Sequence, residues 1–292
     1  MTLSPVVDKL YETVEAKGHV CVGLDTSADY VPPQERRKET SDAEAVLSFN
    51  KALIDATLDI AACFKVQIAY YEEMGTAGLC AYAQTLKYIR DKKGIVIADI
   101  KRGDIADTAL RYAKAHYSGD FEADFVTLNP YMGMDSIEPW LSEAQKLGKG
   151  AFVLMRTSNP GMRDFEYLEL ANKKRLYHEV GNKLLQVAEK NKGKYGYGLF
   201  GAVIGCTERE EAAEIRKDYP SLFFLIPGYG AQGGGAKDAA LLLNNKNGGV
   251  VNASRSIITA WQKEETECVS NAQAGEAARR AAIKMRDEIL CA

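Results

Sequence analysis

The segment IVIADIKRGDIADTAL, residues 95–110, carries the residues best suited to chemistry, because an apolar run ends there in charged side chains. Side chains of a strand alternate between its two faces, so Asp99 and Lys101 are expected on the same face. Ile95, Val96 and Ile97 before them are typical of a buried strand. A charge at the end of such a strand needs a partner or a function, and a structural ion pair is the competing interpretation.

Asp104 follows Lys101 by three residues, so the segment has the form D-x-K-x-x-D. A lysine buried alone loses its proton readily and becomes a nucleophile for Schiff-base chemistry, whereas one flanked by carboxylates is held as an ammonium ion. An ammonium ion can stabilise a developing carbanion and then protonate it, while a neighbouring carboxylate repels a departing anionic group. A simpler interpretation of Asp104 is that it caps the following helix, with Asp107 in the first turn.

A second group of residues, later in the chain, suggests phosphate binding. Residues 227–235 read PGYGAQGGG and residues 252–257 read NASRSI. The planar guanidinium of Arg255 suits bidentate contact with a phosphate, and the amide of Gln232 could add a donor. A glycine-rich loop alone is usually just a flexible turn. Both segments, however, follow the last two of eight strand-like runs, where barrels commonly bind phosphate.

Eight short apolar runs alternate with helical patterns. They span residues 19–25, 62–68, 94–101, 124–130, 151–157, 199–206, 222–230 and 248–255. Such runs are typical of parallel strands covered on both faces, and eight is the number of strands in a (β/α)8 TIM barrel. Most polar residues of the runs lie at their C-terminal ends: Asp25, Lys65, Asp99, Lys101, Asn129, Thr157, Gln232 and Arg255. In a barrel these ends surround one mouth, which favours the barrel over a doubly wound open sheet.

Two connections, residues 26–42 and 158–175, are longer than a link between elements requires. They are either surface insertions or lids over a site. No break in composition divides the 292 residues, so we expect one domain over residues 1–292.

Composition excludes several classes of protein. The formal net charge of −3 argues against a nucleic-acid partner, and no apolar run is long enough to cross a membrane. The six cysteines have no C-x-x-C spacing, which argues against a zinc site and a disulfide framework. The N-terminal residues lack the pattern of a secretory signal. These features predict a cytoplasmic protein.

Several motifs together resemble the orotidine 5′-phosphate decarboxylase family. They are LDTS, FKVQ, D-x-K-x-x-D-I-x-x-T, TSNPG, PGYGAQGG and ASRS, in this order between Gly23 and Ile257. The segments TLNPYMG and MRTSNPG resemble the longer bacterial subgroup, which works as a standalone protein. The D-x-K-x-x-D element is the specific part of the resemblance.

The resemblance implies a role for each site residue. Asp99, Lys101 and Asp104 would form a catalytic array, with Asp104, Ile105 and Thr108 supplied by the second subunit of a homodimer. Asp25 and Lys65 would bind the ribose hydroxyls, Ser158 the pyrimidine, and Gln232 and Arg255 the phosphate. Asn159 departs from the pattern, since some relatives carry His there. The family's loops after the fifth and seventh strands close over the ligand, which favours a lid role for the region after Ser158 and for the loop around Gln232.

The implied reaction converts orotidine 5′-phosphate to uridine 5′-phosphate without a cofactor or a metal ion. Two other functions remain open at this point. A sugar-phosphate aldolase or epimerase on the same kind of barrel could use D-x-K-x-x-D to hold Mg²⁺ and an enediolate. A catalytically silent protein could bind the nucleotide without turning it over. His19, His116 and His178 fall outside the motifs, and we expect them to be structural.

Overall fold

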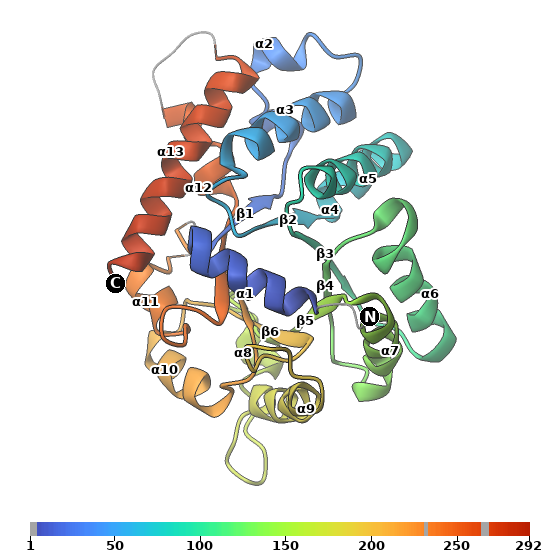
Figure 1. Cartoon of the computed structure of the whole chain (residues 1–292), viewed down its shortest axis with the longest axis vertical. Coiled ribbons are helices and arrows are strands. Elements are labelled where there is room, and N and C mark those ends of the chain that lie inside the picture. Colours follow the sequence, from blue (N-terminus) through green and yellow to red (C-terminus); the bar gives the residue numbers. More distant parts are fainter. Residues whose placement is uncertain (1–4, 231–232, 264–268) are drawn as a thin grey trace.

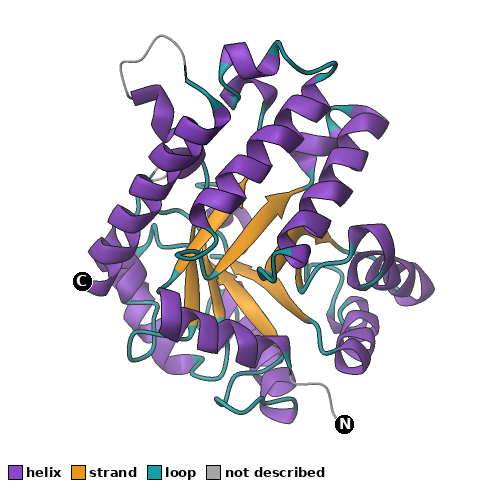
Figure 2. Cartoon of the chain, turned by 45° about the horizontal axis from the view of Figure 1, so that its top comes forward, coloured by secondary structure: helices purple, strands orange, loops and turns teal. Residues whose placement is uncertain are grey.

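The computed structural model describes residues 5–230, 233–263 and 269–292, in which eight parallel strands form one closed barrel in chain order (Figure 2). The strands are β1 (Val20–Leu24), β2 (Cys63–Gln67), β3 (Val96–Arg102), β4 (Phe125–Leu128), β5 (Gly150–Arg156), β6 (Phe200–Ile204), β7 (Phe224–Ile226) and β8 (Gly249–Ala253). Strand β8 pairs with β1, with Val20 opposite Val251. The sheet therefore has no edge, which confirms the predicted TIM barrel and rules out the open doubly wound sheet.

Helices surround the barrel (Figure 1). The α-helices are α1 (Val6–Lys17), α2 (Pro33–Arg36), α3 (Asp42–Thr57), α4 (Ala69–Glu72), α5 (Gly75–Asp91), α6 (Ala106–Tyr117), α7 (Glu138–Leu147), α8 (Met162–Phe165), α9 (Leu176–Lys190), α10 (Arg209–Asp218), α11 (Ala236–Ala240), α12 (Arg255–Ile258) and α13 (Asn271–Leu290). Short 3₁₀ helices are η1 (Ala28–Tyr30), η2 (Gly119–Phe121), η3 (Met134–Ser136) and η4 (Ala260–Lys263). Within the described residues, no helix is both long and apolar enough to cross a membrane.

Each predicted apolar run coincides with one of the eight strands, although β3 and β5 each extend one residue beyond the predicted run. The strands are apolar along almost their whole length because one face packs inside the barrel and the other against helices. Residues of β1, β4, β6, β7 and β8 are all buried. The rings of Phe125 and Phe152, on neighbouring strands, stack with centroids 5.0 Å apart. The exposed or partly exposed residues of β2 and β3, such as Gln67 and Lys101, lie at the strand ends, and in β5 Leu154 is partly exposed.

Helix α1 covers the mouth of the barrel at the N-terminal ends of the strands. The amide of Val6 donates to the carbonyl oxygen of Gly148 (3.0 Å), just before β5. The side-chain amide of Asn247, just before β8, donates to the carbonyl oxygen of Tyr11 (3.3 Å). In Figure 1, α1 lies across the ends of several strands. The opposite mouth, at the C-terminal ends, holds the polar strand ends.

The start of α6 differs from the prediction that Asp104 caps it. The helix begins at Ala106, its N-cap residue is Ile105, and no side chain caps it. The carboxylate of Asp104 instead accepts a hydrogen bond from the amide of Ile105 (2.8 Å). Asp104 lies one position too early to reach the free amides of the first turn, where cap bonds form. Asp107 lies in that first turn, as predicted.

Candidate active site

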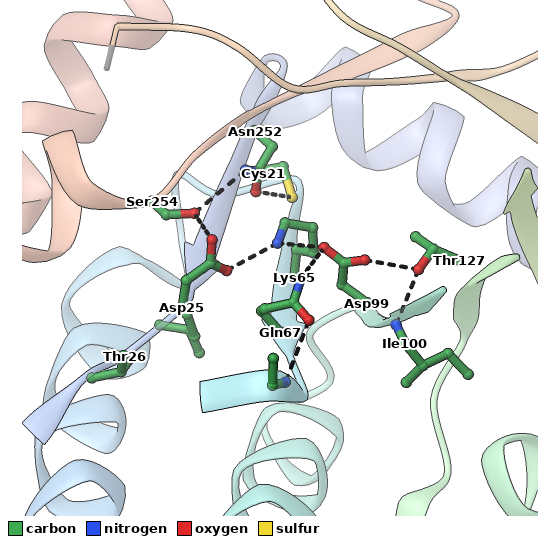
Figure 3. Close-up of polar contacts among 12 residues, drawn as sticks. Cys21, Asp25, Thr26, Lys65, Gln67, Asp99, Ile100, Thr127, Asn252 and Ser254 are labelled. Atoms are coloured by element: carbon green, nitrogen blue, oxygen red, sulfur yellow. Dashed lines mark hydrogen bonds and ion pairs between the residues drawn. The ribbon is translucent and has the colours of Figure 1, made fainter. Parts of the chain in front are cut away.

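Four side chains at the ends of β1, β2 and β3 form a chain of alternating charge, and Figure 3 shows three of them, Asp25, Lys65 and Asp99. The ammonium of Lys65 lies between two carboxylates, with Nζ 2.9 Å from Oδ1 of Asp25 and 2.9 Å from Oδ2 of Asp99. The ammonium of Lys101 lies 2.6 Å from Oδ1 of Asp99. Parallel strands in a barrel place these C-terminal ends side by side, as Lys65 opposite Gly23 and Gln67 opposite Asp99 show.

Lys65 is the lysine that is buried among the residues the structure describes, with 4% of its surface exposed. Burial opposes its charge, but the carboxylates of Asp25 and Asp99 outweigh that effect and hold its pKa above the ordinary value. Lys65 is therefore a fixed ammonium ion, not a nucleophilic amine.

Asp99 accepts hydrogen bonds from four side chains. Its Oδ2 accepts from Lys65 and from the amide of Gln67 (2.9 Å), and its Oδ1 accepts from Lys101 and from the hydroxyl of Thr127 (2.8 Å). Burial alone would raise the pKa of Asp99, but the two lysines outweigh it and hold that pKa well below its usual range. Asp99 is a permanent carboxylate at the centre of the array.

The backbone around Lys101 departs from a regular strand. Lys101 has φ of +45°, a conformation unusual for a residue with a side chain, and the register between β3 and β4 shifts here. The alternation rule correctly predicts that Asp99 and Lys101 meet, but it does not predict this bulge. About half of the Lys101 side chain, 48%, stays exposed, whereas Asp99 is buried.

The array continues from Asp25 into β8 (Figure 3). The hydroxyl of Ser254 donates to Oδ2 of Asp25 (2.8 Å), and the side-chain amide of Asn252 donates to that hydroxyl (3.4 Å). Gly23 makes room for this contact, because a Cβ at position 23 would lie 2.0 Å from the Ser254 hydroxyl oxygen. Ser254 therefore fixes the orientation of the Asp25 carboxylate.

Ser158 lies on another wall of the same cavity, after β5. Its backbone packs closely on Gly205, where a Cβ would approach the Cα of Ser158 to 2.8 Å. Thr157 beside it is bound by Glu166, whose carboxylate accepts from the Thr157 amide (2.8 Å) and hydroxyl (2.7 Å). Burial raises the pKa of Glu166. The loop after β5 is thus tied back to the strand end; whether it closes as a lid stays a prediction.

Arg255 lies at the start of α12, directly after β8, and its exposed guanidinium has no carboxylate partner among the residues the structure describes. It lines the cavity with Tyr70 and Tyr229. Gln232, the other residue predicted to bind phosphate, lies outside the described residues. The loop before it turns through Gly228 and Gly230, which have φ of +103° and +74°.

One cavity of about 500 Å³ brings these residues together at the C-terminal mouth of the barrel. The predicted residues that line it are Asp25, Lys65, Asp99, Lys101, Ser158 and Arg255. Leu154, Val203 and Leu225 supply apolar surface. The cavity therefore has a charged wall, an apolar wall and an unpaired cation at its rim.

Three predicted residues do not line this cavity: Asp104, Ile105 and Thr108. Ile105 and Thr108 are exposed, Asp104 is partly exposed, and 48% of the apolar Ile105 faces solvent. Within one chain, Lys101 therefore has Asp99 as its carboxylate partner and Asp104 does not join them.

Neither a metal centre nor a histidine site is evident. In the described ranges, no group of three or more His, Cys, Asp or Glu side chains is arranged to hold a metal ion. His19, His116 and His178 are buried and none lines the cavity.

Sequence reasoning missed four polar residues that hold the array in place: Gln67, Thr127, Asn252 and Ser254. Gln67 and Ser254 stand within the FKVQ and ASRS motifs, and Asn252 and Thr127 lie in strand runs. A search for every polar side chain at the strand ends would have found them. It would not have revealed which carboxylate each one binds.

This arrangement suits stabilisation of negative charge by a fixed cation. The two ammonium groups cannot relax away from the cavity without breaking ion pairs, so they are preorganised. The same cavity is lined by the guanidinium of Arg255 and by the charged wall, which would suit an elongated polar ligand with an anionic group at one end.

Comparison with known proteins identifies the family. A family model described as orotidine 5′-phosphate decarboxylase / HUMPS family matches residues 18–267. An orotidine 5′-phosphate decarboxylase of Clostridium acetobutylicum is 55% identical over 285 residues, which are 97% of this chain and 98% of that protein. One of Clostridium perfringens is 56% identical over 284 residues, with 97% and 98% coverage.

Solved structures agree. The structure of Leishmania donovani OMP decarboxylase matches 98% of both chains with a TM-score of 0.74 and 28% identity. A structure of Leishmania donovani UMP synthase matches 98% of this chain and 57% of that one, with a TM-score of 0.76 and 30% identity. The chain thus belongs to the orotidine 5′-phosphate decarboxylase family of TIM barrels, and it is a carboxy-lyase.

Proposed function

We propose that this enzyme decarboxylates orotidine 5′-phosphate to uridine 5′-phosphate in de novo pyrimidine biosynthesis, and that Lys101 is the residue that stabilises and protonates the carbanion. The observation that carries the proposal is the position of the Lys101 ammonium, which is 2.6 Å from the buried carboxylate of Asp99 and partly open to the cavity. The choice of substrate is supported by the relatives named orotidine 5′-phosphate decarboxylase, which are 55% and 56% identical to this chain.

The proposed chemistry breaks the bond between C6 and the carboxylate of the substrate. The bonding electrons stay on C6 as carbon dioxide leaves, and the Lys101 ammonium stabilises them. Lys101 then donates a proton from Nζ to C6, giving the product and a neutral amine that solvent reprotonates. The fixed negative charge of Asp99 disfavours the bound substrate carboxylate more than the uncharged carbon dioxide, which lowers the barrier.

The remaining cavity residues would bind the rest of the nucleotide. We assign the ribose hydroxyls to Asp25 and Lys65, the pyrimidine to Ser158, and the phosphate to Arg255 and Gln232. The unpaired guanidinium of Arg255 supports this assignment, since it is the cation of the cavity that no described carboxylate neutralises.

We expect the reaction to need neither a metal ion nor an organic cofactor. Every carboxylate oxygen of Asp25 and Asp99 already accepts a hydrogen bond from a lysine or a hydroxyl group. A metal ion would have to displace these donors before it could bind.

The function can be tested with the purified chain and excess chelator. Orotidine 5′-phosphate should lose its ultraviolet absorbance as it is converted, and Lys101→Ala should lower kcat by at least about a hundredfold while still binding uridine 5′-phosphate. Inhibition by the chelator, or a borohydride-trapped adduct with a sugar phosphate, would instead favour the aldolase or epimerase. Binding of the nucleotide without turnover by the wild type would indicate a silent binding protein.

We further propose that the enzyme is a homodimer with shared sites, in which Asp104, Ile105 and Thr108 enter the partner's cavity. Exposed apolar residues near this segment and on the loops after β4 and β5 support an interface: Ile105, Tyr131, Met132, Phe165 and Leu168. The rings of Tyr131 and Phe165 pack edge to face with centroids 6.4 Å apart, so the two loops form one apolar surface. A second copy would cover it.

Subunit mixing tests the shared site. If Lys101→Ala and Asp104→Ala subunits exchange randomly, half of the dimers are mixed and each mixed dimer has one intact site, so about a quarter of wild-type activity should return. Mixing Lys101→Ala with Asp99→Ala is the control, because both changes affect the same half of each site and no activity should return. Equal recovery in the two mixtures, or none in the first after proven exchange, would contradict shared sites.

Two broader assignments accompany this function. We propose that residues 1–292 form a single domain, since the barrel and its helices account for the described parts of the chain. We also propose a cytoplasmic location; the exposed, unpaired thiols of Cys80 and Cys291 are consistent with a reducing compartment.

A further inference from the structure

The pairing of β3 with β4 contains an irregularity at the site of proposed chemistry. Ala98 lies opposite Val126 and Arg102 lies opposite Leu128. Three residues of β3, positions 99–101, therefore face the single residue Thr127 of β4. Such a bulge bends a strand and removes regular backbone hydrogen bonds from the extra residues.

The hydroxyl of Thr127 replaces those missing bonds. Its Oγ1 accepts from the amides of Ile100 and Lys101, both at 3.0 Å, and it donates to Oδ1 of Asp99 at 2.8 Å. A hydroxyl group has one proton to donate and two lone pairs, so this set of three bonds uses its whole capacity. Thr127 itself is 1% exposed, and Figure 3 shows its bonds to Asp99 and to the amide of Ile100.

One oxygen atom thus fixes both ends of Lys101. The backbone of Lys101 is bound to Thr127 directly, in a conformation with positive φ that the local sequence does not favour. The Lys101 ammonium is bound to Oδ1 of Asp99, the same carboxylate oxygen that accepts the Thr127 proton. A shift of this hydroxyl would move the ammonium, the carboxylate and the backbone between them together.

We propose that Thr127 is a positioning residue, whose hydroxyl sets the distance and direction between Lys101 and Asp99 in the reaction. This inference rests on the proposed function, because it assigns Thr127 a role in the same decarboxylation. It predicts an effect on the chemical step and little effect on binding of the nucleotide, since the ribose and phosphate are held by other residues.

Two substitutions at position 127 and one elsewhere test the proposal. Thr127→Val keeps the shape of the side chain and removes the hydroxyl, whereas Thr127→Ser keeps the hydroxyl and removes the methyl group. The matched control is Thr57→Val, because Thr57 is also buried and its hydroxyl bonds only to its own helix, at the carbonyl oxygen of Leu53 (2.7 Å). The measurements are kcat, KM, thermal unfolding, affinity for uridine 5′-phosphate, and hydrogen exchange of the amides of Ile100 and Lys101.

Thr127→Val should lower kcat by about tenfold to a hundredfold, because a small displacement of a reacting group has effects of that size. Its KM and its affinity for uridine 5′-phosphate should change less than about threefold, exchange at Ile100 and Lys101 should accelerate, and Thr127→Ser should restore most of kcat. Thr57→Val should leave kcat unchanged despite a lower unfolding temperature.

Several results would overturn the proposal. They are wild-type kcat in Thr127→Val, a kcat in Thr127→Ser as low as in Thr127→Val, or a fall in kcat in Thr57→Val equal to that in Thr127→Val. The assay of the wild type distinguishes failure of this inference from failure of the proposed function, because an inactive wild-type chain would refute the decarboxylase activity. Hydrogen exchange at the amides of Ile100 and Lys101 in Thr127→Val would still report whether the hydroxyl holds the bulge.

Discussion

Replacing Asp99 by Asn is the sharpest perturbation of the charged array. The substitution keeps the size and shape of the side chain and removes the negative charge that two lysines share. It also converts one acceptor oxygen into an NH₂ group. That group must face either Lys65 and Gln67 or Lys101 and Thr127, all of which are donors toward Asp99.

The loss of stability can be worked out from the two ion pairs. At an effective dielectric constant near 20, charges 2.9 Å apart, as in Lys65 and Asp99, attract by roughly 6 kcal/mol before desolvation is subtracted. Removing one partner of a buried pair typically destabilises a protein by about 3–5 kcal/mol, because the remaining charge stays buried. Because Lys65 still pairs with Asp25, we expect Asp99→Asn to lower the free energy of unfolding by the smaller amount in this range, about 3 kcal/mol. Because the Lys101 side chain is about half exposed, water screens its ion pair with Asp99, and we expect that pair to contribute little to stability.

The effect should depend on pH in a defined direction. The lysines hold the pKa of Asp99 below its unfolded value of about 3.9, so its contribution to stability is complete above about pH 4 and is lost as the pH falls further. The pKa of Lys65 is raised above about 10.4, so its contribution is complete below that pH and is lost as the pH rises toward the folded pKa. The difference in stability between wild type and Asp99→Asn should therefore be constant from about pH 5 to pH 9 and shrink at either extreme.

Urea unfolding at several pH values, together with kcat for orotidine 5′-phosphate, measures both effects. Asp91→Asn is the matched control, because Asp91 pairs with Lys87 at 2.7 Å on the exposed face of α5. That change should alter the free energy of unfolding by no more than about 0.5 kcal/mol and leave kcat unchanged. Equal losses of stability in the two variants, or wild-type kcat in Asp99→Asn, would refute the reasoning.

Two further predictions concern the rim of the cavity and the core. Arg255→Ala should raise KM for orotidine 5′-phosphate by about tenfold to a hundredfold and lower kcat/KM, without weakening the binding of uridine, which has no phosphate. The control Arg209→Ala, whose exposed side chain lies outside the cavity, should change neither KM nor kcat/KM. An unchanged KM in Arg255→Ala would show that Arg255 does not bind the phosphate. Burial, and to a lesser degree the charge of Arg102, lowers the pKa of His116 to about 4, so its contribution to stability is complete above the unfolded value of about 6.5 and is lost as the pH falls through 4. Through His116, the free energy of unfolding of the wild type should fall by about 3 kcal/mol between pH 7 and pH 4. His116→Phe, whose ring suits the neighbouring rings of Phe121 and Trp140, should not show this loss. The same pH dependence of the free energy of unfolding in the two proteins would contradict the prediction.

The sequence predicts the barrel because its pattern is local and repeated. Each apolar run contains a strand, and the polar residues that end the runs meet at one mouth because parallel strands share a direction. The contact of Asp99 with Lys101 follows from the same alternation. Predicting these features requires only the alternation of side chains along each strand and the number of strands that close a barrel, and the apolar runs supply both.

Other features of the site depend on tertiary contacts that no local pattern encodes. The bulge in β3 requires a hydroxyl on β4, and the orientation of Asp25 requires Ser254 from the far end of the chain and a glycine at position 23. The helix cap assigned to Asp104 was wrong because the first turn of α6 begins one residue later than the pattern suggests. Whether Asp104 completes a site depends on a second chain.

The charges of the array give a physical reason for a second chain to take part. Within one chain, two carboxylates and two ammonium groups sum to zero, and Lys65 is neutralised on both sides. Lys101 has one described carboxylate partner and an open side toward the cavity, so in the proposed reaction it is the ammonium of the array that would meet negative charge on the substrate. A carboxylate from a partner would give the array an excess negative charge, which repels the substrate carboxylate and is relieved as that group leaves as neutral carbon dioxide. In the proposed reaction a single chain would supply the cation Lys101 and the carboxylate Asp99, and a carboxylate of the proposed partner would add to the repulsion of the substrate carboxylate.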